Sequence, residues 1–109
     1  MSDDAVLLVL CTAPAQGDVA ETLARGLVDG RLAACVNIVP GVRSFYRWQG
    51  EVQDEAEVQL LIKTRRGRFG ALSAWLAEHH PYEVPEILAL PIADGSQPYL
   101  EWLRAQTAP

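Results

Sequence analysis

Cys11, His79 and His80 are side chains of types that bind transition metals, and the histidines are the two of the chain. Neutral imidazole is a common ligand of zinc and copper, and both metals also accept cysteine thiolate. His79 and His80 are adjacent and end a helical pattern, where free carbonyl groups and the helix dipole favour a positive charge. These residues form a candidate metal site, whereas the alternative interpretation of the histidine pair is an ordinary polar helix end.

The segment that follows the histidines is expected to be an ordered, extended connection. Pro81 disfavours helical backbone angles at His80, and Pro85 does the same at Val84. An apolar run that begins at Ile87 is typical of a strand. The two imidazoles are therefore expected on a stiff loop between a helix and a strand.

Apolar patterns around this loop predict four strands and three helices. Strands are expected at residues 5–12, 32–48, 51–64 and 86–92. The second strand is expected to run over residues 32–39, to bend or bulge at Pro40-Gly41 and to resume over residues 42–48, where a tight turn at Gln49-Gly50 leads into the third strand. The first helix is expected between an N-cap at Asp18 and a left-handed stop at Gly30, the second over residues 69–78 and the third over residues 98–105.

This order of elements predicts an α+β ferredoxin-like split βαβ fold, with residues 1–109 forming a single domain. Right-handed crossovers place both long helices on one face of a four-stranded antiparallel sheet. The first strand is then central, and the fourth pairs with it at the edge. Cys11, at the end of the first strand, is thus expected at the same rim of the sheet as His79 and His80.

A thiol and two imidazoles at one rim would form a ligand set for Cu(I), Cu(II) or Zn(II). The alternative for Cys11 is a small buried apolar side chain in a central strand. Cys35 lies in an apolar strand and is expected to be inert.

The opposite face of the predicted sheet has no helix to cover it, apart from the reach of the short C-terminal one. Its strands nevertheless carry apolar residues on both alternating sets, which would expose more than the few hundred Å² usual for a monomer. We therefore expect a homo-oligomer whose sheets pack together. Residues 51–57 of the hairpin are acidic and are expected to project into solvent, where the hairpin edges can pair with a neighbouring subunit.

Composition restricts the partners of the chain. It has 109 residues, of which 50% are hydrophobic and 21% charged, and a formal net charge of -5. These values favour a folded domain and argue against nucleic acid or an anionic membrane as a partner. The first apolar run, residues 5–11, is too short to span a membrane and lacks the basic flank of a signal peptide. A cytoplasmic location with reduced thiols is therefore expected.

Four segments, in this order, give the sequence a more specific resemblance. They are Leu32-Ala33-Ala34-Cys35-Val36-Asn37, Ser44-Phe45-Tyr46-Arg47-Trp48-Gln49-Gly50, Ile62-Lys63-Thr64 and His80-Pro81-Tyr82-Glu83-Val84-Pro85-Glu86-Ile87. Together they resemble the CutA family of divalent-cation tolerance proteins, and the resemblance extends from about Ala5 to Leu103.

The resemblance implies a ferredoxin-like subunit in a very stable homotrimer, similar in architecture to PII signalling proteins, with extended hairpins exchanged between subunits. It also implies a cytoplasmic role in tolerance to copper and other divalent cations. In bacterial members, copper binding is attributed to a cysteine and two adjacent histidines. These positions correspond to Cys11, His79 and His80 in this sequence.

Three functions follow from the sequence as hypotheses. The leading one is a non-enzymatic trimer that binds copper, or another divalent cation such as zinc, at the cysteine and the two histidines. The alternative is a PII-like regulatory trimer that binds a small ligand or a partner protein in clefts between subunits, near Trp48, Tyr82 and Glu83. An enzyme that uses the cysteine or a histidine is the third, but no phosphate-binding loop, dinucleotide fingerprint or oxyanion-hole glycine motif supports it.

Overall fold

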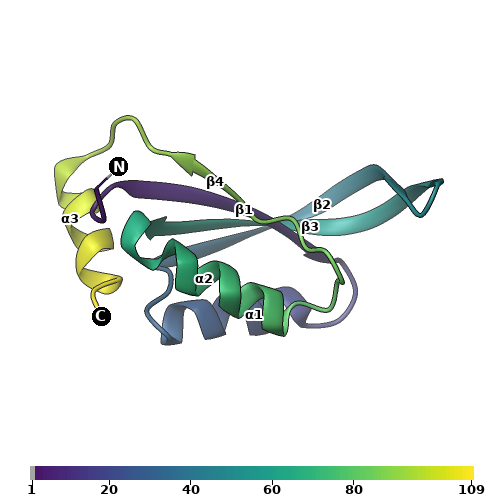
Figure 1. Ribbon diagram of the computed structural model, residues 1–109, viewed down its shortest axis with the longest axis horizontal. Helices are drawn as coiled ribbons and strands as arrows, with labels where there is room; N and C mark the ends of the chain where they lie inside the picture. Colours follow the sequence, from purple (N-terminus) through teal and green to yellow (C-terminus); the bar gives the residue numbers. More distant parts are fainter. Residues whose placement is uncertain (1) are drawn as a thin grey trace.

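A computed structural model describes residues 2–109 as a four-stranded antiparallel sheet with three helices (Figure 1). The strands are β1 (Val6–Pro14), β2 (Cys35–Trp48), β3 (Glu51–Arg65) and β4 (Leu88–Pro91), and the helices are α1 (Val19–Asp29), α2 (Arg66–His79) and α3 (Gln97–Gln106). The strand order is β2-β3-β1-β4 and every neighbouring pair is antiparallel. The predicted ferredoxin-like pattern is therefore confirmed, with β1 inside the sheet and β4 at its edge.

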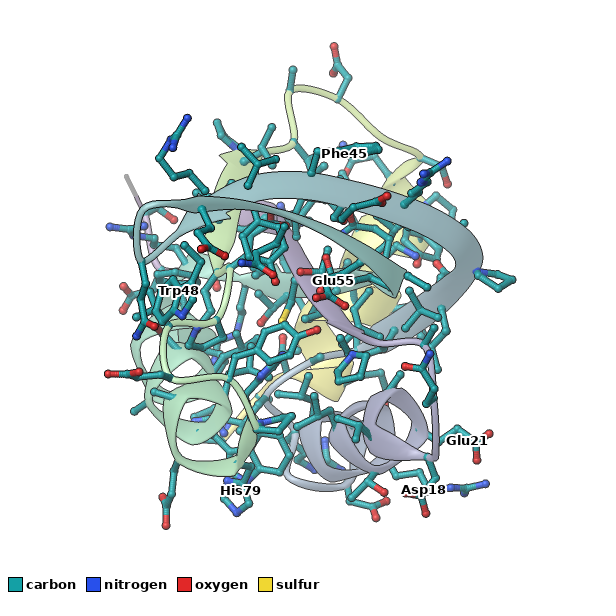
Figure 2. The ribbon with its side chains drawn as sticks, turned by 90° about the vertical axis from the view of Figure 1, so that its right-hand side faces the viewer. Asp18, Glu21, Phe45, Trp48, Glu55 and His79 are labelled. Atoms are coloured by element: carbon teal, nitrogen blue, oxygen red, sulfur yellow. The ribbon has the colours of Figure 1, made fainter. Side chains whose placement is uncertain are left out.

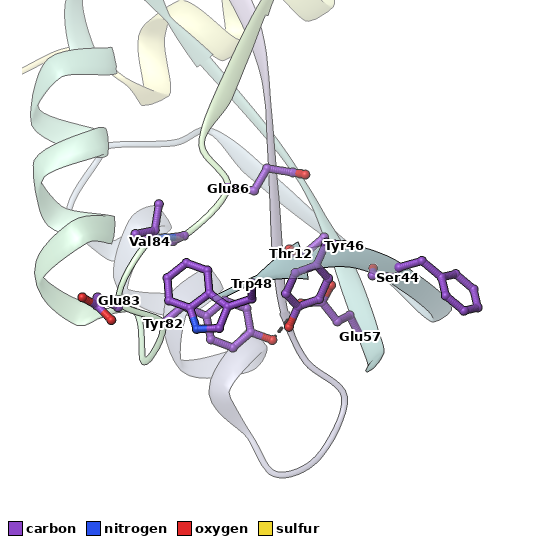
Figure 3. A pocket seen from close by; sticks show the side chains of 11 residues that line it. Thr12, Ser44, Tyr46, Trp48, Glu57, Tyr82, Glu83, Val84 and Glu86 are labelled. Carbon is purple, nitrogen blue, oxygen red and sulfur yellow. Dashed lines mark hydrogen bonds between the residues drawn. The ribbon is translucent and has the colours of Figure 1, made fainter. Parts of the chain in front are cut away.

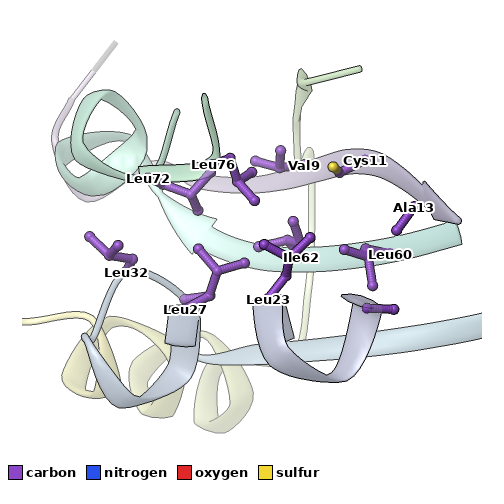
Figure 4. Packing of buried hydrophobic residues seen from close by; sticks show 12 residues of the cluster. Val9, Cys11, Ala13, Leu23, Leu27, Leu32, Leu60, Ile62, Leu72 and Leu76 are labelled. Atoms are coloured by element: carbon purple, nitrogen blue, oxygen red, sulfur yellow. The ribbon is translucent and has the colours of Figure 1, made fainter. Parts of the chain in front are cut away.

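Helices α1 and α2 cover the same face of the sheet, as predicted (Figure 1). Leucines four residues apart on each helix are fully or almost fully buried against alternate residues of the central strands. Figure 4 shows Leu23 and Leu27 of α1 facing Val9 of β1 and Ile62 of β3. Burying a leucine of this kind contributes roughly 1.5–3 kcal/mol. This cluster fixes the position of α2, and so of the loop that follows it.

The other face of the sheet is largely bare within the described chain. Leu8 and Leu10 of β1 pair with Leu90 and Leu88 of β4, and the two β4 side chains are 43% and 56% exposed. Helix α3 reaches only one end of this face, where Leu103 packs with Val6 and Ala34. Most of the apolar surface on this face therefore has no helix over it.

Strands β2 and β3 form a long hairpin that extends well beyond the rest of the molecule (Figure 1). Its turn has positive φ at Gln49 (51°) and Gly50 (81°), which is the conformation that a two-residue hairpin turn requires. The predicted bulge lies between Val39 and Val42, with Gly41 at φ 79°. Both sequence signals for the hairpin are thus confirmed.

Strand β1 extends beyond the end predicted at Thr12. Proline cannot donate a ladder hydrogen bond, so Ala13-Pro14 was expected to stop the strand. Pro14 instead pairs with Glu57 of β3, and the partner strand on its other side is absent there because β4 pairs only with residues 7–10. The missing N–H therefore faces a vacant side of β1 and costs no ladder bond.

Two predictions about the end of α1 and the start of β2 are wrong. Gly30 has φ −81°, and the left-handed residue is Arg31 at φ 57°. Strand β2 begins at Cys35 because the N–H groups of Leu32 and Ala33 donate to the Leu27 carbonyl and close the helix. Residues 32–34 are buried as a helix-to-strand connection.

The sequence predicted one helix N-cap, at Asp18. Asp18 precedes α1 as predicted, but its side chain makes no capping hydrogen bond. Ser96 accepts a hydrogen bond from the Tyr99 N–H and starts α3.

No helix within residues 2–109 has the length and apolar character that crossing a membrane requires.

Candidate functional site

The imidazole of His80 links the loop after α2 to the end of β1. His80 has an extended backbone (φ −76°, ψ 139°), as its position before proline predicts, and is 6% exposed. Its Nε2 lies 2.8 Å from the Thr12 carbonyl oxygen, and its Nδ1 lies 3.1 Å from the Tyr82 backbone nitrogen, which donates to it. A carbonyl oxygen can only accept, so Nε2 carries the proton and Nδ1 is the acceptor. Both ring nitrogens are therefore engaged within the chain.

This imidazole takes the place of a strand residue beside β1. The Val6 carbonyl accepts from the Ile92 N–H on the β4 side, and alternate backbone groups of β1 point the same way. The Thr12 carbonyl belongs to this series, but β4 was predicted to span residues 86–92 and begins only at Leu88. The strand is shorter than predicted because His80, and not a residue of β4, donates to Thr12.

His79 points away from this contact. It is the last residue of α2, and its ring stacks on that of Trp75, with centroids 4.1 Å apart and planes 18° apart. Its Nδ1 lies 2.9 Å from the Trp75 carbonyl oxygen, so Nδ1 carries the proton of the neutral ring. The ring lies at the outer surface (Figure 2), and its Nε2 lone pair makes no hydrogen bond with residues 2–109. This nitrogen can bind a cation.

The Cys11 thiol lies in the apolar core. The residue is fully buried with the leucines under α1 and α2, and its Sγ lies 3.6 Å from the Thr12 carbonyl oxygen (Figure 4). Burial, followed by the negative charges of Glu86 and Glu57, raises the pKa of the Cys11 thiol to about 12. The thiol is therefore protonated near neutral pH, and thiolate is the form that binds a metal.

The described structure brings Cys11 and His80 to one rim of the sheet, through their shared neighbour Thr12, and turns His79 outward. Within residues 2–109, no three side chains of Cys, His, Asp or Glu lie close enough to hold one metal ion. As placed in one chain, the predicted ligands do not fit a shared metal centre: His79 points away, both ring nitrogens of His80 are engaged, and the Cys11 thiol is buried and protonated. Binding by all three residues stays a prediction.

A cleft between the hairpin and the loop after α2 lies beside this rim. Its volume is about 690 Å³, and we call it the loop–hairpin cleft. Four aromatic side chains line it, namely Phe45, Tyr46, Trp48 and Tyr82. Its charged lining consists of Glu57, Glu83 and Glu86, and the remaining lining residues are Thr12, Ser44, Val84 and Pro85. Trp48, Tyr82 and Glu83, which the sequence grouped at a cleft between subunits, line this cleft within one chain.

Glu57 is the residue of this cleft that the sequence analysis placed wrongly. Residues 51–57 were expected in solvent, but Glu57 is only 5% exposed. The Tyr82 hydroxyl donates to its Oε2 over 2.7 Å, as Figure 3 shows, and burial together with this contact raises the pKa of Tyr82. The one signal in the sequence is position, since Glu57 directly precedes the core-like run that begins at Val58.

Comparisons with known proteins identify the family of the chain. The family described as "CutA1 divalent ion tolerance protein" matches residues 7–106. The divalent-cation tolerance protein CutA of Thermus thermophilus is 55% identical over 100 residues, which cover 92% of this chain and 96% of that protein. The CutA protein of Yersinia pestis strain Pestoides F is 46% identical over 99 residues, which cover 91% and 82% respectively.

Solved structures agree with the sequence comparisons. The structure of the divalent cation tolerance protein from Thermus thermophilus has a TM-score of 0.90 at 53% identity and covers 94% of this chain and 99% of its own. CutA from Xylella fastidiosa has a TM-score of 0.91 at 41% identity, with 98% and 100% covered. CutA from Archaeoglobus fulgidus, described as a periplasmic divalent cation tolerance protein, has a TM-score of 0.90 at 33% identity, with 94% and 99% covered. From its sequence and its fold, this chain belongs to the CutA1 family of divalent-cation tolerance proteins.

Proposed function

We propose that this protein confers tolerance to divalent cations by binding the cation itself, without catalysis. The observation that carries the proposal is the exposed Nε2 lone pair of His79 at the end of α2. Imidazole suits copper and zinc, and the carboxyl end of a helix favours positive charge. We expect copper to bind best, because divalent copper exceeds zinc in affinity for most nitrogen sites.

One imidazole binds a metal weakly, so further ligands are required. One source is the predicted set, in which Cys11 and His80 join His79. That arrangement requires His80 to release Thr12 or Tyr82 and the Cys11 thiol to lose its proton. The other source is a neighbouring subunit, which leaves the His80 contacts intact. These two arrangements predict different effects of the same substitutions.

We further propose that the protein is a homotrimer. The exposed Leu88 and Leu90 side chains, and the apolar strand residues beside them, form a surface that an isolated subunit would leave in water. Packing the bare sheet faces of three subunits together would bury it. Sedimentation of dilute protein tests this, and a single folded particle of 11.9 kDa would contradict it.

A cytoplasmic location completes the proposal. Cys11 and Cys35 are free cysteines in the structure, which fits a reducing compartment. Fractionation of cells that produce the untagged protein tests this location. Recovery of the protein from the periplasm, the location given for the Archaeoglobus fulgidus relative, would contradict it.

Titration of copper and zinc into untagged protein tests the site. The variants are His79→Ala, His80→Ala, Cys11→Ser and the His79→Ala, His80→Ala double variant. Loss of binding in His79→Ala alone, with normal binding in Cys11→Ser and His80→Ala, indicates ligands from another subunit. Loss in all three single variants indicates the joint site. Equal metal uptake by wild type and the double variant rejects both arrangements.

Growth of cells that lack the protein tests the function. Wild-type protein is expected to restore growth in elevated copper, and the variant that loses copper binding in vitro is expected to fail at equal protein level. Equal rescue by the wild type and that variant would separate tolerance from metal binding and contradict the proposal.

A further inference from the structure

The loop–hairpin cleft contains a negative charge that the described chain does not neutralise. Glu57 is 5% exposed, and within residues 2–109 the only ion pair is that of Arg43 with Asp54, in the outer hairpin. The one hydrogen bond to the Glu57 carboxylate from these residues comes from the neutral hydroxyl of Tyr82. A buried carboxylate is stabilised most by a cation that also donates a hydrogen bond. The missing partner of Glu57 is therefore a positive charge.

The remaining lining of the cleft strengthens this preference. Glu83 and Glu86 add two carboxylates, and the lining contains no Lys, Arg or His. Such a lining excludes anions such as phosphate or a carboxylic acid, because no group would balance their charge. It attracts cations from solution.

The aromatic residues distinguish an organic cation from a metal ion. Trp48 and Tyr46 reach the cleft from β2 and Tyr82 reaches it from the loop (Figure 3), so aromatic rings border the same space as the Glu57 carboxylate. The faces of such rings attract ammonium groups. The acidic side chains, in contrast, do not gather into a three-ligand metal group within residues 2–109. The volume of about 690 Å³ falls within the roughly 300–1,000 Å³ of small-molecule sites.

We infer that the loop–hairpin cleft binds a small organic ammonium ion, whose charge pairs with Glu57 and whose carbon groups lie against Trp48 and Tyr46. This site is separate from the proposed metal ligand His79, which is on the outer surface of α2 and does not line the cleft. The inference adds an organic ligand to the proposed function and does not depend on metal binding. A protonated alkyl amine supplies both the charge and an N–H donor, whereas a quaternary ammonium ion such as choline supplies the charge and can donate through its hydroxyl group.

Calorimetric titration of the untagged protein, in its native oligomeric state, tests the inference. The probes are choline, butylammonium and 3,3-dimethylbutan-1-ol, which has the shape of choline but no charge. At least one ammonium probe is expected to bind once per chain, and the neutral alcohol is expected to bind much more weakly. If neither ammonium probe binds, the inference is wrong. This result is also expected if a side chain of a second copy of the chain fills the cleft.

Two substitutions assign the binding to the cleft. Glu57→Gln removes the charge and keeps an oxygen that can accept from Tyr82, and it is expected to weaken binding about tenfold. The matched control is Glu21→Gln, which makes the same change of net charge at an exposed position of α1 and is expected to leave binding unchanged. Equal binding by wild type and Glu57→Gln would overturn the inference.

A second variant keeps the test valid if Glu57→Gln fails to fold. Trp48→Leu retains an apolar side chain at a partly exposed position but removes the ring face. This variant is expected to weaken binding of the ammonium probe several-fold and to leave binding of the neutral alcohol unchanged. If the affinities for both probes fall equally, or if neither falls, the ring face of Trp48 does not bind the ammonium group. The His79→Ala variant is expected to bind the ammonium probe normally even when it has lost metal binding.

Discussion

The Nε2 of His80 lies 2.8 Å from the carbonyl oxygen of Thr12, although 68 positions separate the two residues in the sequence. Through this contact, the loop after α2 is attached to the end of β1. The neighbouring His79 hydrogen-bonds to the Trp75 carbonyl and stacks on the Trp75 ring, within its own helix. Two adjacent residues of the same type therefore have different environments, one buried between elements and one at the surface.

The first prediction concerns this difference. His80→Ala removes the donor to Thr12 and the acceptor of the Tyr82 N–H, and is expected to lower the free energy of unfolding by about 1–3 kcal/mol. His79→Ala removes a side chain at the surface and is expected to change it by less than about 0.5 kcal/mol. Urea unfolding measures both values. His80→Gln can replace the Nε2 donor and is expected to recover part of the loss. Equal destabilisation by the two alanine variants would contradict the assignment.

The second prediction concerns the accessibility of the thiols. Cys11 is fully buried and its raised pKa keeps it protonated. Cys35, which was expected from the sequence to be inert, is half-buried with the Lys63 Nζ 3.8 Å from its Sγ and is the more accessible thiol. Iodoacetamide is expected to label Cys35 before Cys11 in the native protein and both residues in urea, as measured by peptide mass spectrometry. Rapid native labelling of Cys11 would show that β1 opens at this end.

The third prediction concerns the outer hairpin. Arg43 donates two hydrogen bonds to Asp54, of 2.9 and 2.8 Å, and this contact holds the pKa of the Asp54 carboxyl below its ordinary value of 3.8. A lowered pKa in the folded state stabilises the fold above pH 3.8, and this contribution disappears as the pH falls through the folded value. Both side chains are exposed, so the effect on stability is expected to be small.

An NMR titration measures the Asp54 carboxyl directly. In Arg43→Gln the pKa of Asp54 is expected to return toward its ordinary value. The exposed Arg47 donates to the backbone carbonyl of Gly50, so Arg47→Gln is a control that is expected to leave the titration of Asp54 unchanged. An unshifted Asp54 in the wild type would show that the ion pair does not persist in solution.

The fourth prediction connects helix packing to the exposed imidazole. A Cβ at Gly26 of α1 would overlap the Trp75 ring of α2, so Gly26→Ala must displace that ring, on which His79 is stacked. The variant is expected to lose stability and to weaken copper binding through His79. Gly70→Ala is the control, since a Cβ there meets nothing within 4 Å, and it is expected to stabilise the helix by up to about 1 kcal/mol. Thermal unfolding and copper titration of both variants provide the measurements, and normal copper binding by Gly26→Ala would contradict the link.

Patterns that act within a few residues predicted most of the fold correctly. Alternating and four-residue spacings located the strands and helices, and Gln49-Gly50 and Pro40-Gly41 identified the hairpin turn and the bulge. The errors arose where a distant contact decides the local structure. Pro14 remains in β1 because β4 ends before it and no ladder hydrogen bond is lost there. Residues 32 and 33 are not in β2 because their N–H groups donate to the Leu27 carbonyl.

The candidate site shows the same limit. Topology correctly placed the end of β1 beside the segment that contains the histidines, but it did not determine where each ring points. The backbone carbonyls of Thr12 and Trp75 determine this, and neither has a signature in the sequence. Glu57 was also misplaced, because its burial depends on Tyr82, which is 25 positions away.

The early end of β4 leaves the last residues of β1 without a second partner strand, and such a border can template the addition of a foreign β-segment. The donor from His80 already occupies one of the backbone acceptors on this border, and the proline at position 14 presents no donor at all. The two residues together therefore leave few backbone groups on this edge of β1 to pair with an added strand. The imidazole that the sequence predicted as a metal ligand thus also covers part of the open border of the sheet.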